Sequence, residues 1–183
     1  SVGALFTCFL VIPVVNWCAQ TYGKLNTFIA SQSVSLLGYI LLWWGFSPED
    51  PWMMFIPLPL FAFGIGGLFT IMMSMTADVI DIDELNTGKR REGIFGAIYW
   101  WMVKVGYGIA GALSGVIITV VGFNSDLATT DQQAAVDGLH AFFCFFPMIG
   151  TILAMLIMRN YNITEERALE IRSQLAERKE IKN

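Results

Sequence analysis

Five apolar stretches, each near or above the length that spans a bilayer, constrain the fold of this chain more than any other feature. They cover residues 2–19, 28–46, 52–77, 94–123 and 139–158. A helix needs about 20 apolar residues to cross the hydrocarbon core. Because lipid offers the backbone no hydrogen-bond partners, only helices and closed barrels span it. The alternation of barrel strands is absent, so we expect five membrane-spanning helices.

The composition agrees with a membrane protein. Hydrophobic residues make up 55% of the 183 residues and charged residues 14%, with a mean hydropathy of +0.59. A soluble domain carries about 25% charged residues. The three cysteines lie in apolar stretches at no metal-binding spacing, and no nucleophile–base constellation or phosphate loop is present. We therefore predict no enzyme, no bound cofactor or metal and no nucleic-acid partner.

The basic residues predict which side of the membrane each connection occupies. With the exception of Lys104, every Lys and Arg lies in the first connection, the third connection or the C-terminal tail. The second and fourth connections contain none. Cytoplasmic loops are enriched in Lys and Arg. We therefore expect a cytoplasmic C-terminus and, with five spans, a first residue on the outer side. This arrangement predicts that the chain is a fragment of a longer protein.

Lys104 is the exception, ten residues into the fourth apolar stretch. An ammonium group at the bilayer centre costs at least ~2.5–3.5 kcal/mol on insertion scales. Trp100 and Trp101 precede it by one helical turn on the same face, and Gly108 follows it by one turn. This stripe suits a polyhydroxylated ligand or a mobile carboxylate partner. The alternative is a structural ion pair with an acid of another helix.

A dense charged segment, residues 78–92, separates the third and fourth apolar stretches, and we interpret it as a loop. Its charged residues are Asp78, Asp81, Asp83, Glu84, Lys89, Arg90, Arg91 and Glu92. The spacing of the acids fits no EF-hand, and the basic residues lie among them, so salt bridges are expected rather than a metal site. We predict that this segment forms a cytoplasmic gate.

Glycines, prolines and the tail give three further expectations. The Gly and Pro residues of the stretch 52–77 predict a bent helix beside a cavity. Gly111 and Gly115 form a GxxxG pair that permits close helix packing. The tail from Asn162 predicts a helix with its apolar stripe against the bundle or the lipid surface, and a solvated tail is the alternative. That stripe consists of Ala168, Ile171 and Leu175.

The run ADVIDIDELNTGKRREGIFGAIYWWMVKVG resembles the signature of the glycoside–pentoside–hexuronide:cation symporters, the melibiose-permease branch of the major facilitator superfamily. The shared elements are Ala77-Asp78, the acidic turn 81–84, Thr-Gly-Lys-Arg at 87–90, Glu92-Gly93 and Lys104 followed by a glycine. The resemblance covers essentially the whole chain. It implies an all-α membrane protein with helices eight to twelve of a twelve-helix fold in residues 1–160. Residues 161–183 would form a cytoplasmic tail helix.

The resemblance also implies a function. It is sugar:cation symport by alternating access across the bacterial inner membrane, with a sugar or sugar-like solute bound near the midplane between two six-helix halves. The family's helix-eleven lysine lies in the sugar and coupling region and matches Lys104. Trp100 matches the position one turn earlier, and Trp101 and Phe69 are expected in the cavity wall. Phe69 replaces a tryptophan of the melibiose branch, so a disaccharide specificity does not transfer.

In the family the coupling Na⁺ or H⁺ binds acids of helices two and four, so the resemblance implies a missing N-terminal half as partner, besides the lipid bilayer. Two other interpretations stay open. Related carriers move lysolipids and other amphiphiles, which a tryptophan-rich cavity would accept. A half-length membrane protein that does not transport and acts as a partner of another protein is the third.

Overall fold

The computed structural model describes residues 2–45, 51–124, 128 and 132–182. Every element in these ranges is a helix, as the sequence predicts. The helices are α1 (Val2–Tyr22), α2 (Lys24–Gly45), η1 (Pro51–Phe55), α3 (Pro57–Thr87), α4 (Glu92–Val121), α5 (Gln133–Met158) and α6 (Glu165–Lys182). Of the predicted turn at 47–51 only Pro51 is among the described residues, and 125–127 and 129–131 of the fourth connection also lie outside them.

Four helical segments in the described part of the chain are long and apolar enough to cross a membrane. They are Lys24–Gly45, Trp52–Thr87, Glu92–Val121 and Gln133–Met158. The helix α1 has 21 residues but is not one of these four. The chain is therefore a multi-pass helical membrane protein, and the expected count of five spans is not confirmed.

The closest helix packing is between α2 and α3, where glycines face serines. A Cβ atom added at Gly64 would lie 2.2 Å from the Cβ of Ser35, and one at Gly67 would lie 2.8 Å from the Cβ of Ser31. Small residues of this kind let two membrane helices approach until their backbones nearly touch. The glycines of α3 are thus required by the contact with α2, a role that the sequence did not indicate.

A small apolar core joins α1, α2 and α3. Its buried residues are Val11, Val15, Phe28, Ile71 and Met75. Together with the glycine–serine contact, this core makes the first three long helices the best-packed part of the described structure.

The interpretation of residues 78–92 as a loop was wrong. Helix α3 continues to Thr87, and Gly88, with φ 69°, ends it in the left-handed conformation that glycine adopts without strain. No glycine or proline interrupts the chain between Ala77 and Thr87. The fall in hydropathy therefore marks where the helix leaves the apolar layer, and it does not end the helix. Similarly, α5 begins at Gln133, before the expected residue 139.

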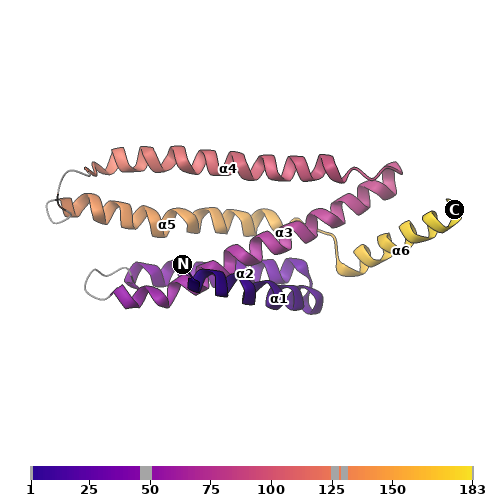
Figure 1. The fold of residues 1–183 in the computed structure, drawn as a ribbon, viewed down its shortest axis with the longest axis horizontal. Helices are drawn as coiled ribbons and strands as arrows, with labels where there is room; N and C mark the ends of the chain where they lie inside the picture. The colour runs from indigo at the N-terminus through magenta and orange to yellow at the C-terminus, as the bar shows by residue number, and fades with distance from the viewer. Residues whose placement is uncertain (1, 46–50, 125–127, 129–131, 183) are drawn as a thin grey trace.

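The helix α4 is packed very differently. Figure 1 shows it along one edge of the molecule beside α5, with α3 crossing from the α1–α2 side to meet its first turn. None of its 30 residues is buried. A Cβ atom at Gly111 or Gly115 would meet nothing within 4 Å, so the GxxxG pair contacts no other helix within the described residues.

Candidate functional site

Asp78, near the end of α3, is the centre of a buried polar cluster. Only 2% of the residue is exposed. Its Oδ2 accepts hydrogen bonds from Lys24 Nζ at 2.5 Å and from the hydroxyl of Tyr161 at 3.0 Å. Its Oδ1 accepts one from Arg172 Nη2 at 2.9 Å. These partners come from the start of α2, the α5–α6 connection and α6. A buried carboxylate requires such partners, because an unpaired charge out of water is very costly.

Tyr161 completes the cluster as a neutral donor. Burial raises the pKa of its phenol, and the neighbouring negative charge of Asp78 raises it further. Tyr161 therefore stays protonated at physiological pH and donates to the carboxylate without adding charge.

Arg90, in the connection between α3 and α4, holds three carboxylates. Its guanidinium lies 3.3 Å from Asp81, 2.6 Å from Glu84 and 2.5 Å from Glu92. The hydrogen bonds with Glu84 and Glu92, in that order, raise the pKa of Arg90. Arg91 pairs with Asp83, with 2.8 Å between Nε and Oδ2. The two arginines thereby fasten the short connection 88–91 to the last turns of α3.

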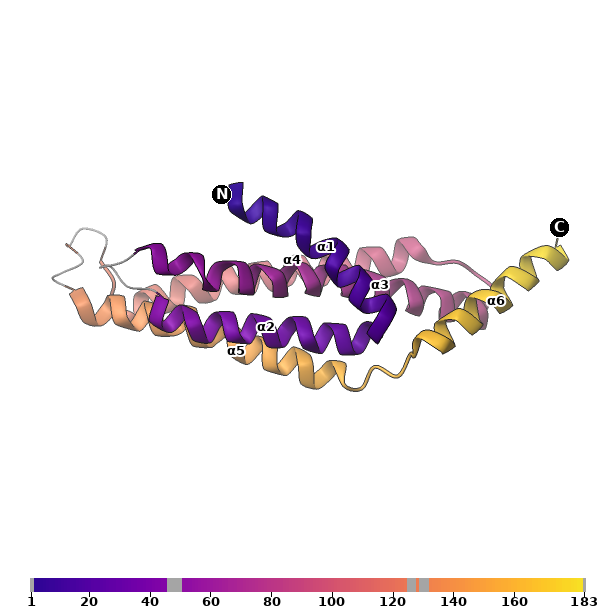
Figure 2. The ribbon, with the colours of Figure 1, turned by 90° about the horizontal axis from the view of Figure 1, so that it is seen from below.

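The helix α6 joins the same cluster from the other side. Arg172 Nε lies 3.5 Å from Asp81, and Lys179 Nζ lies 3.6 Å from Glu84. Arg178 donates a hydrogen bond of 2.6 Å to the backbone carbonyl of Leu85. Figure 2 shows α6 at the end of the bundle where α3 meets α4. The start of α2, the end of α3, the connection 88–91, the α5–α6 connection and α6 therefore meet at one end of the molecule.

The predicted apolar stripe of α6 faces this contact. Ala168, Ile171 and Leu175 are 3%, 3% and 7% exposed, and α6 packs on α3. Thr164 caps the helix by accepting a 3.3 Å hydrogen bond from the backbone N–H of Arg167. The tail from Glu165 is therefore a helix that packs on α3 rather than a solvated tail, and its cytoplasmic placement stays a prediction.

We call this set of interacting residues the charged cluster. It consists of Lys24, Asp78, Asp81, Asp83, Glu84, Arg90, Arg91, Glu92, Tyr161, Arg172 and Lys179. Seven of the eight residues predicted for a gate belong to it, since within the described residues Lys89 forms no ion pair. Sequence reasoning missed Lys24, Tyr161, Arg172 and Lys179. One available signal was that Lys24 is the sole basic residue of the first connection.

The stripe on α4 has the opposite character. Lys104 is exposed, and within the described residues it forms no hydrogen bond or ion pair. Trp100 is 48% exposed and Trp101 63%. The described part of the chain therefore supplies no acid for the structural ion pair that the sequence left open.

The four predicted substrate residues do not share one cavity. Phe69 lies in the wall of a cavity of about 420 Å³ that α3 forms with α2, α4 and α5. Trp100 lies in the wall of a separate cavity of about 150 Å³ between α3 and α4. Lys104 and Trp101 line neither of them.

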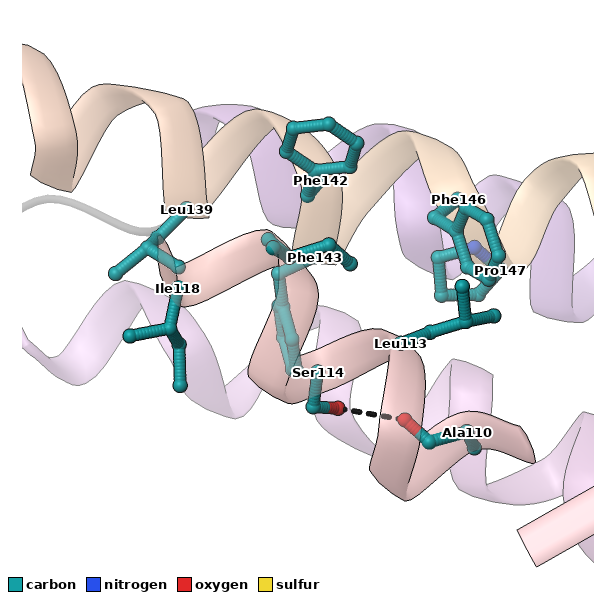
Figure 3. Close-up of a pocket in the computed structure, with 10 residues that line it drawn as sticks. Ala110, Leu113, Ser114, Ile118, Leu139, Phe142, Phe143, Phe146 and Pro147 are labelled. Carbon is teal, nitrogen blue, oxygen red and sulfur yellow. Dashed lines mark hydrogen bonds between the residues drawn. The ribbon is translucent and has the colours of Figure 1, made fainter. Parts of the chain in front are cut away.

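An apolar pocket of about 290 Å³ lies between α4 and α5 (Figure 3). Phe142, Phe143 and Phe146 of α5 line it, and Ser114 is the one residue with a polar side chain among the lining residues. The hydroxyl of Ser114 already donates to the carbonyl of Ala110 at 2.9 Å. This pocket offers a sugar no vacant hydrogen-bond donor, and it suits only apolar groups.

Helices long and apolar enough to span a membrane, with cavities between them, define a helical membrane protein, and the comparisons identify its family. A family model described as "MFS/sugar transport protein" matches residues 2–165. The chain therefore belongs to this family of the major facilitator superfamily, and it is similar to its glycoside–pentoside–hexuronide:cation symporters, as predicted. The family consists of transporters, which are not enzymes.

Three curated relatives that the chain resembles are named as a transporter, a carrier or an importer of sugars. The chain is 25% identical over 161 residues to the isoprimeverose transporter of Lactiplantibacillus pentosus, covering 88% of this chain and 33% of that protein. It is 25% identical over 169 residues to a glucuronide carrier protein homolog of Escherichia coli K12, covering 92% and 36%. It is 27% identical over 180 residues to a putative sulfoquinovose importer of the same organism, covering 98% and 37%. The chain thus spans about a third of the length of these relatives. No solved structure matches it.

Proposed function

We propose that this chain is the C-terminal part of a sugar:cation symporter of the bacterial inner membrane. Membership of the sugar transport family carries this proposal, and names of the relatives support a sugar-like solute. The rest of the transporter would supply the other half of the substrate site and bind the coupling Na⁺ or H⁺. The end of the molecule that holds the charged cluster would be cytoplasmic, because the basic segments gather there.

The charged cluster is proposed to be the cytoplasmic gate. Alternating access requires one end of the carrier to open and close around a fixed site. Exposed ion pairs are each worth only about 0–1 kcal/mol, so the pairs of Arg90 and Arg91 can break one after another. The buried pairs of Asp78 are harder to break. We therefore place the moving part in the connection 88–91 and the fixed anchor at Asp78.

Lys104 is proposed to be a substrate or coupling residue. Lysines within membrane-spanning segments are rare because the charge is costly there, and most face a wet cavity or a partner. Since the described residues give Lys104 no partner, the sugar or a carboxylate elsewhere in the transporter is the expected one. Trp100 and Trp101 would form the aromatic wall beside it, because sugars pack their C–H faces on indole rings.

The test is concentrative uptake of a labelled sugar by cells that express the whole transporter. Lys104→Ala is expected to abolish accumulation without reducing the amount of protein in the membrane. The matched control is Ser114→Ala on the same helix, which removes a hydroxyl bonded only within its own helix and should accumulate sugar normally. Wild-type accumulation by Lys104→Ala would refute the proposed role of this residue.

A second candidate is a carrier of lysolipids or other amphiphiles. The apolar pocket between α4 and α5 favours it, because an acyl chain matches a wall of phenylalanines (Figure 3). Competition for binding to the whole transporter separates the two candidates. A lysophospholipid that competes below its micellar concentration, where sugars do not compete, would establish this candidate in place of the sugar carrier.

A further inference from the structure

Gln132, just before α5, fastens the end of α4 to the start of α5. Its side-chain oxygen accepts a hydrogen bond of 2.8 Å from the backbone N–H of Asn124, and its amide nitrogen donates one of 2.8 Å to the carbonyl of Asn124. The two ends of one side-chain amide are thus bonded to the same backbone residue, and Gln132 is only 9% exposed. We call this pair of hydrogen bonds the Gln132 clamp.

Close packing beside the Gln132 clamp strengthens the same junction. A Cβ atom added at Gly138 of α5 would lie 2.9 Å from the Cγ1 of Val121, the last residue of α4. Gly122, with φ 71°, ends α4, and the N–H of Phe123 donates to the carbonyl of Ile118 at 3.2 Å. The backbone that leads from α4 to the clamp is therefore itself hydrogen-bonded. Figure 1 shows this junction at the end of the molecule opposite α6.

The other end of α4 is held in a different way. Arg90 and Arg91, which fasten the connection 88–91 to α3, have 44% and 43% of their side chains exposed. In the described part of the chain, a Cβ atom at Gly93 or Gly96 would meet nothing within 4 Å, and the cavity of about 150 Å³ lies between this part of α4 and α3. Exposed ion pairs weaken as the salt concentration rises, whereas buried interactions are screened much less. The two ends of α4 therefore differ in their sensitivity to salt.

We propose that Gln132 is a positioning residue, and that α4 turns about the Gln132 clamp when the ion pairs of the connection 88–91 break. Because a helix rises about 1.5 Å per residue, Lys104 lies about 25 Å from the end of α4 at the clamp and Ile94 about 40 Å from it. A turn about the clamp therefore displaces Lys104 less than Ile94 and leaves the junction with α5 in place. The consequence for transport rests on the proposed function, whereas the motion of α4 does not.

Two pairs of spin labels on the whole transporter measure this motion through their dipolar coupling in electron paramagnetic resonance. Val120→Cys with Ala134→Cys is the clamp pair, and Ile94→Cys with Ile157→Cys is the gate pair; all four positions are exposed in the described structure. The three native cysteines are replaced by alanine. Choline chloride at about 1 M shortens the Debye length to about 3 Å without adding Na⁺. We expect it to shift or broaden the distances of the gate pair and to leave those of the clamp pair unchanged.

Two neighbouring glutamines give a matched test of the clamp itself. Gln132→Ala removes both of its hydrogen bonds. Gln133→Ala is the control, because Gln133 carries the same amide but donates it within its own helix, to Asp137 at 2.9 Å. We expect Gln132→Ala to broaden the distances of the clamp pair at low salt. It should also lower the maximal rate of sugar uptake with an unchanged KM, because the clamp positions α4 and does not bind the solute. Gln133→Ala should change neither quantity.

Three results would overturn the proposal. They are a clamp pair that responds to salt as strongly as the gate pair, a gate pair that does not respond, and a clamp pair that stays narrow in Gln132→Ala. The first two are measured with Gln132 intact, so they decide the outcome even if Gln132→Ala does not fold.

The distances are measured without sugar, which separates this motion from the proposed function. A salt response confined to the gate pair, in a protein that takes up no sugar, supports the turn of α4 and overturns the proposed transport. Normal sugar uptake, lost in Lys104→Ala, together with a clamp pair that moves as much as the gate pair, supports the proposed transport and overturns the turn about Gln132.

Discussion

Asp78 and Lys104 are charged residues on apolar helices, and their surroundings are opposite. Asp78 is 2% exposed and receives hydrogen bonds from Lys24, Tyr161 and Arg172. Lys104 is exposed and has no such partner among the described residues. The charge of Asp78 is therefore stabilised within this chain and serves its architecture. The described residues do not stabilise the charge of Lys104, and we propose that a ligand or another part of the transporter does so.

The largest expected effect on stability comes from Asp78→Ala. Removing one partner of a buried ion pair costs about 3–5 kcal/mol, because the other charge stays buried without compensation. Here Lys24, with 10% of its side chain exposed, would be left in that state. The thermal unfolding temperature of the purified protein in detergent measures the loss.

The matched control is Asp83→Ala. Its partner Arg91 has 43% of its side chain exposed, so water can solvate the released guanidinium. We expect a much smaller loss of stability than for Asp78→Ala. Equal losses for the two variants would contradict the central position of Asp78.

The next largest effect is expected from a substitution that weakens the packing of α6 on α3. Ile171→Ser removes a buried side chain whose burial is worth about 1.5–3 kcal/mol. We expect faster amide hydrogen exchange throughout α6, with little change in α2 and α3. Leu169→Ser on the same helix is the control, because Leu169 is 57% exposed. Unchanged exchange in Ile171→Ser would show that α6 is held by its ion pairs alone.

A third comparison uses two glycines. Gly64→Ala places a methyl group where the Cβ of Ser35 lies only 2.2 Å away, and overpacking of this kind costs about 1–3 kcal/mol. Gly111→Ala meets open space within the described structure. Thermal unfolding should therefore distinguish the two. An equal loss for Gly111→Ala in the whole transporter would reveal a helix packed on this face of α4.

The smallest effect is expected from the cap of α6. Thr164→Ala removes the hydroxyl that accepts from the N–H of Arg167, and loss of a cap typically costs about 1 kcal/mol. Hydrogen exchange should quicken in the first turn of α6 only. Exchange that quickens across the whole helix would mean that the cap, rather than the apolar stripe, holds α6 in place.

The sequence predicted the helices and the stripe of α6 because both follow from local pattern. Runs of apolar residues specify spanning helices, and the spacing of Ala168, Ile171 and Leu175 specifies one helical face. The predicted end of α3 was too early, because a run of acidic residues marks where a helix passes from lipid into water and does not break the helix. Only Gly88 does so.

The partners of Asp78 were beyond local pattern. Lys24, Tyr161 and Arg172 are separated from it by 54, 83 and 94 residues, and only the packing of α2, α3 and α6 brings them together. The polar residues that join Phe69 in its cavity were missed for the same reason, because they come from three helices: Gln32, Ser35 and Tyr39 from α2, Tyr107 from α4 and Thr151 from α5.

The most direct test measures stability and transport on the same preparations of Lys104→Ala and Asp78→Ala. We predict that Lys104→Ala unfolds at the wild-type temperature yet accumulates no sugar, and that Asp78→Ala unfolds at a clearly lower temperature. If Lys104→Ala instead loses stability to the same extent as Asp78→Ala, then Lys104 is a structural residue. That result would contradict the proposed division between an architectural Asp78 and a functional Lys104.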